Sequence, residues 1–290
     1  MNFNNKQGGI NMKNIGLIGV GVMGKSMVPN LMKHGYSVSI YARNKDNVED
    51  VLAEGAAWCP SLAACTAGQD AVITIVGFPQ DVEAVYFGPA GILDSVDPGT
   101  CLIDMTTTSP ELDQRIYAAA LEKGARMLDA PVTGGDIGAK NGQLTILVGG
   151  LKADFDACYD LFSAMGSKIV YMGPSGNGQR TKLANQVAIA GAIAGVCEAI
   201  SFAQAVGLDP AQTLDAISSG AAGSFQMSSN GPKILQGNFA PGFFIKHFVK
   251  DMILAQDELV KQDATLKILD DVLGMYQELE QRGLGAEGTP

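Results

Sequence analysis

Positive charge is scarce in this chain of 290 residues. It has 20 lysines and arginines against 30 aspartates and glutamates, a formal net charge of -10, and no block of basic residues. Nucleic acids and anionic membrane surfaces are bound through basic patches, so we expect neither as a partner. An anionic ligand would have to be held by a local site, against the field of the whole molecule.

Cysteine and histidine are also few. The five cysteines are an odd number without any C-x-x-C spacing, and there are only two histidines. This pattern favours reduced thiols in a cytoplasmic protein over a disulfide framework. It offers no cluster with metal-ligand spacing, so we expect no metal site.

The sequence has a single long apolar stretch. Residues 183–207 are mostly apolar, but they include Asn185, Gln186, Glu198 and Gln204. We interpret this stretch as a buried helix rather than a membrane span. The first residues are polar and have no apolar core of a secretory signal, so we expect residues 1–12 to be a flexible arm.

Strand-like and helix-like patterns alternate through the first 175 residues. Strands are expected at 14–19, 36–43, 71–77, 100–105, 125–131, 143–150 and 167–173, and helices at 22–35, 45–55, 80–87, 110–123 and 152–165. This alternation predicts βαβ units and a parallel sheet, that is, an α/β domain over 13–175.

Only helical patterns follow, at 177–206, 210–219, 224–236, 244–262 and 265–281. We therefore expect an all-helical domain over 176–290. Its first helix would begin at the domain boundary, where ligand clefts commonly form.

A glycine-rich turn follows the first expected strand and opens the first expected helix. It has the G-x-G-x-x-G pattern and consists of Gly19, Val20, Gly21, Val22, Met23 and Gly24. Such a turn lets backbone N–H groups at a helix N-terminus approach a pyrophosphate. In this context it predicts a doubly wound, Rossmann-type dinucleotide-binding domain. The alternative is an ordinary turn in a chain with 36 glycines.

The end of the second expected strand indicates which dinucleotide is bound. NAD sites usually have an acidic residue there for the ribose hydroxyls, whereas an arginine suits the 2′-phosphate of NADP. This chain has Arg43 and Asn44. We therefore expect NADP(H) to be preferred over NAD(H), the alternative being that Arg43 is a solvated surface residue.

Four segments in order resemble the β-hydroxyacid dehydrogenase family, which includes 3-hydroxyisobutyrate dehydrogenase and tartronate semialdehyde reductase. They are GLIGVGVMGKSMVPNLMKHG (16–35), DAPVTGGDIGAKNGQLTILVGG (129–150), GNGQRTKLANQ (176–186) and KHFVKDMILA (246–255). The resemblance extends over nearly the whole chain from about residue 13. It implies a nicotinamide-dependent oxidoreductase that acts on a small carboxylate-bearing aldehyde or hydroxyacid.

The resemblance also implies roles for individual residues. Lys182 matches the catalytic lysine and Asn185 the asparagine that orients the substrate, while Thr133, Gly134 and Gly135 match the loop that holds the substrate carboxylate. The positions that match cofactor contacts, besides the glycine turn, are Phe78, Pro79, Thr107 and Lys250. One departure is Gln186, where members commonly have a second asparagine.

The proposed chemistry explains a lysine at the start of an apolar helix. Reduction of an aldehyde leaves negative charge on its oxygen, which a nearby ammonium can stabilise and protonate. Desolvation on an apolar helix favours the neutral amine that the reverse reaction needs as its base. Lys182 and Asn185 are three residues apart and would share one face of that helix.

The sequence leaves two other functions open. One is a non-catalytic dinucleotide-binding protein of the same fold, and the other is an imine reductase of related architecture. The lysine in K-x-x-N argues against both, since the first would tolerate its loss and the second usually has another residue there. The resemblance further implies a homodimer or dimer-based homotetramer, formed through the long helices of the second domain.

Overall fold

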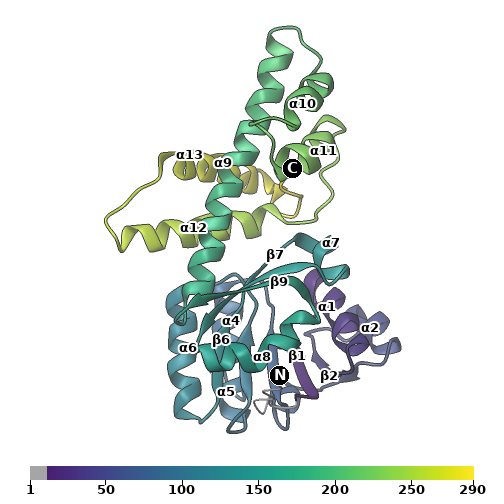
Figure 1. Cartoon of the computed structure of the whole chain (residues 1–290), viewed down its shortest axis with the longest axis vertical. Helices are drawn as coiled ribbons and strands as arrows, with labels where there is room; N and C mark the ends of the chain where they lie inside the picture. Colours follow the sequence, from purple (N-terminus) through teal and green to yellow (C-terminus); the bar gives the residue numbers. More distant parts are fainter. Residues whose placement is uncertain (1–11) are drawn as a thin grey trace, which may run out of the picture. The chain divides into compact units, whose positions relative to one another are not determined.

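The computed structural model describes residues 12–290, which form two compact units divided after Lys182 (Figure 1). Helix α9 (Asn177–Ala205) runs through this division. The arm expected at residues 1–12 lies, except for Met12, outside the described residues.

A nine-stranded sheet forms the centre of the first unit, in the order β3-β2-β1-β4-β5-β6-β8-β7 with β9 beside β8. The strands are β1 (Asn14–Ile18), β2 (Ser37–Tyr41), β3 (Ala57–Trp58), β4 (Ala71–Thr74), β5 (Cys101–Asp104), β6 (Arg126–Asp129), β7 (Val132–Thr133), β8 (Leu144–Gly150) and β9 (Gly166–Gly173). Strands β1 to β6 are parallel in the order 3-2-1-4-5-6, which confirms the predicted Rossmann-type α/β fold.

The sheet is parallel except at one edge, where the direction of one strand was not predicted. Strand β8 runs antiparallel to β6 and β7 and parallel only to β9. The segment between β6 and β8 holds the two-residue strand β7 and the six-residue helix α7 (Gly135–Lys140). It has no helix long enough for a crossover, so the chain turns back. Strands β3 and β7 are too short to show a sequence period and were not predicted.

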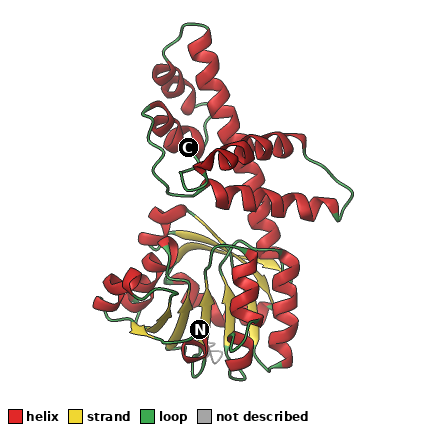
Figure 2. Ribbon diagram, turned by 180° about the vertical axis from the view of Figure 1, so that it is seen from behind, coloured by secondary structure: helices red, strands yellow, loops and turns green. Residues whose placement is uncertain are grey.

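Helices cover both faces of this sheet (Figure 2). They are α1 (Val22–Lys33), α2 (Glu49–Ala53), α3 (Leu62–Thr66), α4 (Pro79–Phe87), α5 (Ile92–Ser95), α6 (Pro110–Glu122), α7 and α8 (Lys152–Ser163). Neighbouring residues of one strand enter opposite cores: Ile73 packs with α1 and α8, and Val72 with α4 and α6. A strand that is apolar on both faces accounts for the continuous apolar runs in the sequence.

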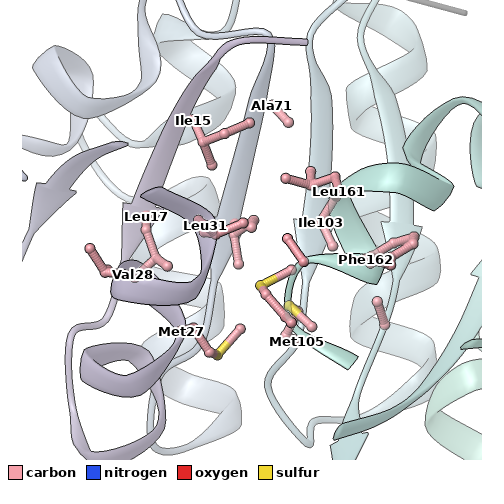
Figure 3. Packing of buried hydrophobic residues seen from close by; sticks show 14 of the residues in the cluster. Ile15, Leu17, Met27, Val28, Leu31, Ala71, Ile103, Met105, Leu161 and Phe162 are labelled. Carbon is pink, nitrogen blue, oxygen red and sulfur yellow. The ribbon is translucent and has the colours of Figure 1, made fainter. Parts of the chain in front are cut away.

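Figure 3 shows part of the larger core, which joins β1 and α1 to β5 and α8. Its labelled side chains are Ile15, Leu17, Met27, Val28, Leu31, Ala71, Ile103, Met105, Leu161 and Phe162. All of them are almost completely buried. This packing fixes the carboxyl ends of the strands, where the predicted ligand-binding residues lie.

The second unit is helical, as predicted. After α9 it contains α10 (Pro210–Ser218), a π-helical turn (Gln226–Asn230), α11 (Gly231–Leu235), α12 (Ile245–Val260), α13 (Lys267–Leu279) and a last π-helical turn (Glu280–Leu284). Its main core is formed by α9, α12 and α13, and includes Ile193, Phe248 and Leu273.

Helix α9 differs in part from the buried helix that we expected. It is the one described helix whose length and apolarity would suffice to cross a bilayer, and about a third of its most apolar window (33%) is buried in the structure. One face packs into the core through Leu183, Ala190 and Ile193, while residues such as Phe202 are exposed.

Candidate functional site

Two glycines of the turn between β1 and α1 are required by the fold. Gly19 has φ +98°, and a Cβ there would lie 2.2 Å from the carbonyl oxygen of Ile75. A Cβ on Gly24 would lie 2.4 Å from the carbonyl oxygen of Gly19. Any side chain at either position would therefore displace backbone, and the turn brings α1 close against the end of β1.

Gly21 has a different environment. Its φ of -85° suits any residue, and nothing described lies within 4 Å of where its Cβ would stand. It is the N-cap of α1, and no side chain among residues 12–290 caps this helix. The first N–H groups of α1 thus have no side-chain cap, and the space where a Cβ at Gly21 would stand is open. This cradle fits the pyrophosphate of a dinucleotide, and a side chain at Gly21 would fill it.

Of the remaining turn residues, Val20 is buried, Met23 is half-buried and Val22 is exposed. The turn is also tied to the next strand, because the N–H of Gly19 donates to the carbonyl of Tyr41 at 3.2 Å. The end of β2 is thereby held beside the turn, and with it the position of Arg43 two residues further on.

The Arg43 side chain is 88% exposed, and its Nη1 lies 3.6 Å from Oδ1 of Asp81. An exposed pair at this distance contributes little to stability. The other carboxylate oxygen of Asp81 accepts the N–H of Phe78 at 3.1 Å. Asp81 thus links Arg43 to the segment of Phe78 and Pro79 that opens α4 (Pro79–Phe87).

Asn44 has a local role in the structure. Its side-chain oxygen accepts the N–H of Asp46 at 3.0 Å, which forms a turn leading into the short helical segment that follows. This hydrogen bond occupies the side-chain oxygen of Asn44. A phosphate would not bind that oxygen, because both are hydrogen-bond acceptors. The amide nitrogen is the group of Asn44 that suits an anion.

Three threonines follow β5, and the structure separates their environments. Thr106 is buried, and its hydroxyl accepts the N–H of Val76 at 3.0 Å. Thr108 is buried, and its N–H donates to Oε1 of Gln179 at 3.1 Å. Thr107, between them, is half-buried. The residue that caps helix α6 is Ser109, not one of the threonines.

Three buried carboxyl groups belong to Asp104 at the end of β5, Asp129 at the end of β6 and Asp113 on α6. Oδ1 of Asp104 accepts from the Thr74 hydroxyl at 2.8 Å and from the Thr106 N–H at 3.1 Å. Burial raises the pKa of Asp104 to about 6. Burial, with the charges of Asp104 and Asp129, raises the pKa of Asp113 well above its usual range.

One buried oxygen on Asp104 and one on Asp113 have no hydrogen-bond partner among the described residues. Burial favours the neutral form of both acids, and a neutral carboxyl group has an O–H to donate. Among residues 12–290 no group of three or more His, Cys, Asp or Glu is arranged to hold a metal ion.

The third acid, Asp129 at the end of β6, holds the start of α9. Its Oδ1 accepts the N–H of Gly176 at 2.7 Å, and its Oδ2 accepts the N–H of Gln179 at 3.0 Å. Burial raises the pKa of Asp129, and these backbone hydrogen bonds oppose the rise. A Cβ at Gly178 would lie 2.4 Å from the Leu147 carbonyl oxygen, so the helix start sits directly on the sheet.

Gln179 completes this attachment of α9. Its Nε2 donates to Oδ2 of Asp113 and to the carbonyl of Thr106, both at 2.7 Å, while its Oε1 accepts from Thr108. The first turn of α9 is thus joined to the ends of β5 and β6. Lys182 follows three residues later, and it is 8% exposed.

The predicted carboxylate loop lies between β7 and α7. Gly134 and Gly135 have φ of +127° and +65°, so a side chain at either position would be strained. Both glycines are exposed, and Thr133 is half-buried. The backbone at this turn is therefore accessible.

In the second unit, the polar residues of α9 meet those of α12. Nε2 of Gln186 donates to Oδ2 of Asp251 at 2.7 Å, and Nδ2 of the half-buried Asn185 donates to Oε1 of Gln186 at 2.8 Å. Lys250 Nζ lies 3.0 Å from Oδ1 of Asp251. Asn185 and Lys250, which were predicted from separate segments, are thus connected through Gln186 and Asp251.

Sequence reasoning missed several residues of these networks. Asp113, Asp129, Gln179 and Asp251 are all buried and polar. Three of them lie inside or beside the recognised segments, as in DAP (129–131) and the Lys250–Asp251 pair. Their signal was an acid or amide at the edge of an apolar run. Such a residue is equally common at an exposed strand or helix end, so their burial was not predictable.

Comparisons with known families divide the chain in two. Residues 14–173 match the model described as the NAD binding domain of 6-phosphogluconate dehydrogenase. Residues 176–289 match the model described as NAD-binding of NADP-dependent 3-hydroxyisobutyrate dehydrogenase.

Similar proteins cover almost the whole chain. The uncharacterized oxidoreductase YkwC of Bacillus subtilis is 47% identical over 277 residues, 96% of each chain. An NAD-dependent L-serine dehydrogenase of Pseudomonas aeruginosa is 34% identical over 280 residues, 94% of each chain. The solved structure of Mycobacterium tuberculosis 3-hydroxyisobutyrate dehydrogenase with L-serine has a TM-score of 0.86 and 27% identity, and covers 95% of this chain and 96% of its own.

The two kinds of glycine in the turn predict different effects of substitution by alanine, one on dinucleotide binding and the other on stability. Gly21→Ala should fold with an unchanged melting temperature, since its Cβ meets no described atom, yet weaken dinucleotide binding at least tenfold by filling the cradle. Gly19→Ala should lower the melting temperature, because the change forces backbone apart. Thermal unfolding and titration of NADPH fluorescence measure both. Equal binding by wild type and Gly21→Ala would contradict the assignment of the cradle.

The raised pKa of Asp104 predicts a pH dependence of stability. The folded-state pKa of Asp104, about 6, is above its unfolded value. Its contribution to stability is therefore largest at low pH and declines as pH rises to about 6, by at most about 1.4 kcal/mol per pH unit. In urea unfolding, wild type should lose stability relative to Asp104→Asn between pH 4.5 and 7. The exposed Asp94→Asn is the control, and a constant difference for Asp104→Asn would disprove the shift.

Proposed function

The chain belongs to the β-hydroxyacid dehydrogenase family, and we propose that it transfers a hydride between a nicotinamide dinucleotide and a small β-hydroxyacid or its semialdehyde. That it is an oxidoreductase of this family which binds a nicotinamide dinucleotide follows from the two matched family models and the relatives. The finer proposal is carried by Lys182, a buried lysine one helical turn before Asn185 on α9.

The dinucleotide, when bound, supplies the hydride acceptor or donor at its nicotinamide ring. The residues proposed to hold it are Gly19, Gly21 and Gly24 of the turn, Arg43 and Asn44 after β2, Phe78 and Pro79 before α4, and Thr107 and Lys250. Gly21 leaves space for the pyrophosphate, and Thr107 is the least buried hydroxyl of its group of three.

Lys182 is proposed as the general acid and base. In reduction its ammonium donates a proton to the carbonyl oxygen as the hydride reaches the carbonyl carbon, which gives the alcohol. In oxidation the neutral amine removes the hydroxyl proton while the hydride leaves the carbon. Burial of Lys182 keeps water from competing for this proton.

Asn185 is proposed to orient the substrate, and the turn of Thr133, Gly134 and Gly135 to bind its carboxylate. Both glycines have positive φ and are exposed, and successive N–H groups in such a turn suit an anion. A carboxylate-bearing substrate is consistent with the relatives, because serine is itself a β-hydroxyacid. L-Serine therefore belongs among the candidates, beside 3-hydroxyisobutyrate and short semialdehydes.

The main test measures cofactor absorbance with a panel of small substrates. Glyoxylate and the succinic, methylmalonic and tartronate semialdehydes are tested in reduction, and L-serine and 3-hydroxyisobutyrate in oxidation, with both cofactors. At least one should be turned over, and Lys182→Ala should lose at least a hundredfold in kcat, in the range of a lost general acid. Lys123→Ala, at an exposed site, is the control.

Two results would count against this proposal. If the protein binds NADPH but turns over none of these compounds, a non-catalytic dinucleotide-binding protein becomes the better explanation. If Lys182→Ala retains full activity, another group supplies the proton.

We further propose that NADP(H) is preferred over NAD(H). The support is the exposed Arg43 guanidinium after β2, whose ion pair with Asp81 is long and weak. The pairing of a guanidinium with a phosphate is bidentate and stronger than with a distant carboxylate. The name of the serine dehydrogenase relative, which is NAD-dependent, shows that related proteins differ in this property.

Arg43→Ala should therefore reduce kcat/KM for NADPH about tenfold or more, and kcat/KM for NADH much less. Lys45→Ala removes a positive charge from the same segment and is the matched control. An equal loss with both cofactors would show that Arg43 does not contact the 2′-phosphate.

A further inference from the structure

Gln186 is the residue of the lysine segment that departs from the family pattern, and its side chain makes specific contacts in the structure. It is 1% exposed and reaches from α9 to Asp251 on α12, which is also 1% exposed. An asparagine at this position would be shorter by one methylene and would fall short of the same carboxylate. Gln186 is therefore directed into the helical unit, and does not simply repeat the role of Asn185.

The two hydrogen bonds that connect Asn185 through Gln186 to Asp251 have only one possible order of donors and acceptors. An ionised carboxylate accepts hydrogen bonds and donates none, so Gln186 must turn its NH₂ group toward Asp251. Its carbonyl oxygen then faces Asn185, which must in turn present its own NH₂ group. The observed bonds, from Nε2 of Gln186 at 2.7 Å and Nδ2 of Asn185 at 2.8 Å, have this order.

Lys250 lies beside the same carboxylate. Its Nζ lies 3.0 Å from Oδ1 of Asp251, and its side chain is 11% exposed. Burial of a carboxylate is costly unless it is paired with a positive charge and hydrogen-bonded. Asp251 thus has one oxygen toward Lys250 and the other toward Gln186.

We propose that Asp251 and Gln186 are positioning residues, which fix the carboxamide of Asn185 in a single orientation for the substrate. With one N–H bonded to Gln186, Asn185 retains its Oδ1 and its second N–H for a ligand. A freely rotating carboxamide would offer two orientations, of which one is productive. This inference rests on the proposed function of Asn185, but the hydrogen-bond relay itself does not depend on catalysis.

The kinetic test is a double-mutant cycle of Asn185→Ala and Gln186→Met. Methionine keeps the length of glutamine and removes both of its hydrogen bonds. In the wild-type background, Gln186→Met should lower kcat/KM for the substrate found above about three- to tenfold, as expected for one lost hydrogen bond. In the Asn185→Ala background it should change kcat/KM by less than twofold, because Gln186 acts through Asn185.

A purely structural role predicts another pattern. It would lower the melting temperature and reduce kcat/KM by the same factor in both backgrounds, and that result would overturn the proposal. Gln204→Met, an exposed site on the same helix, controls for the exchange of glutamine for methionine.

A second measurement needs no turnover. The side-chain NH₂ resonances of Asn185 are followed by ¹⁵N NMR in wild type, Asp251→Asn, Gln186→Met and the Asp251→Asn/Gln186→Met double variant. Asp251→Asn should shift or broaden the Asn185 resonances only when Gln186 is present. If it leaves them unchanged in the wild-type background, or shifts them equally without Gln186, the relay does not exist.

The two measurements also separate this inference from the function on which it rests. If no substrate is turned over and the NMR coupling is present, the proposed function fails and the relay stands. If substrate is turned over and the coupling is absent, the function stands and the relay is wrong.

Discussion

The carboxylate of Asp129 determines where the predicted catalytic lysine lies, because it holds the start of α9. It accepts two backbone N–H groups of the first turn, at 2.7 and 3.0 Å, which would otherwise be buried without partners. A carboxylate is favourable at this end of a helix, where the macrodipole is positive. The backbone hydrogen bonds oppose in part the burial that raises the pKa of Asp129.

Helix α9 has several polar residues in an otherwise apolar sequence, and two buried glutamines among them are hydrogen-bonded in the structure. Gln179 is bonded to the sheet of the first unit, and Gln186 is bonded to α12 of the second. Lys182 lies between them along the helix. Buried amides are stable only when their groups are paired, so each glutamine fixes its part of the helix within its own unit.

The first unit also buries polar groups, at the carboxyl ends of its strands. Three carboxyl groups are buried there; burial raises the pKa of Asp104 and Asp113 and so favours their neutral forms, and Asp129 is bonded to backbone N–H groups. These groups connect β5, β6 and α9 in one network of hydrogen bonds. Thr106 and Thr108 belong to this network, which leaves Thr107 as the more accessible hydroxyl of the three.

Much of this protein was determined by local sequence. The apolar periods placed nearly all long strands and helices, and the G-x-G-x-x-G turn indicated the dinucleotide fold, since Gly19 and Gly24 are required by local backbone geometry. Lys182 and Asn185 are predicted site residues, which rest on the family resemblance and on a K-x-x-N spacing that is itself local. The antiparallel strand β8 was not, since its direction depends on which partner it meets.

Only the tertiary structure decided the partners of the buried polar residues. Asp129 and Gly176 are far apart in sequence, as are Gln186 and Asp251, and nothing local distinguishes these residues from solvated ones. Hydrogen bonds of this kind form when strands and helices from distant segments pack together and exclude water. The sequence therefore indicated which residues could act on a substrate, and the fold decided which residues hold them in place.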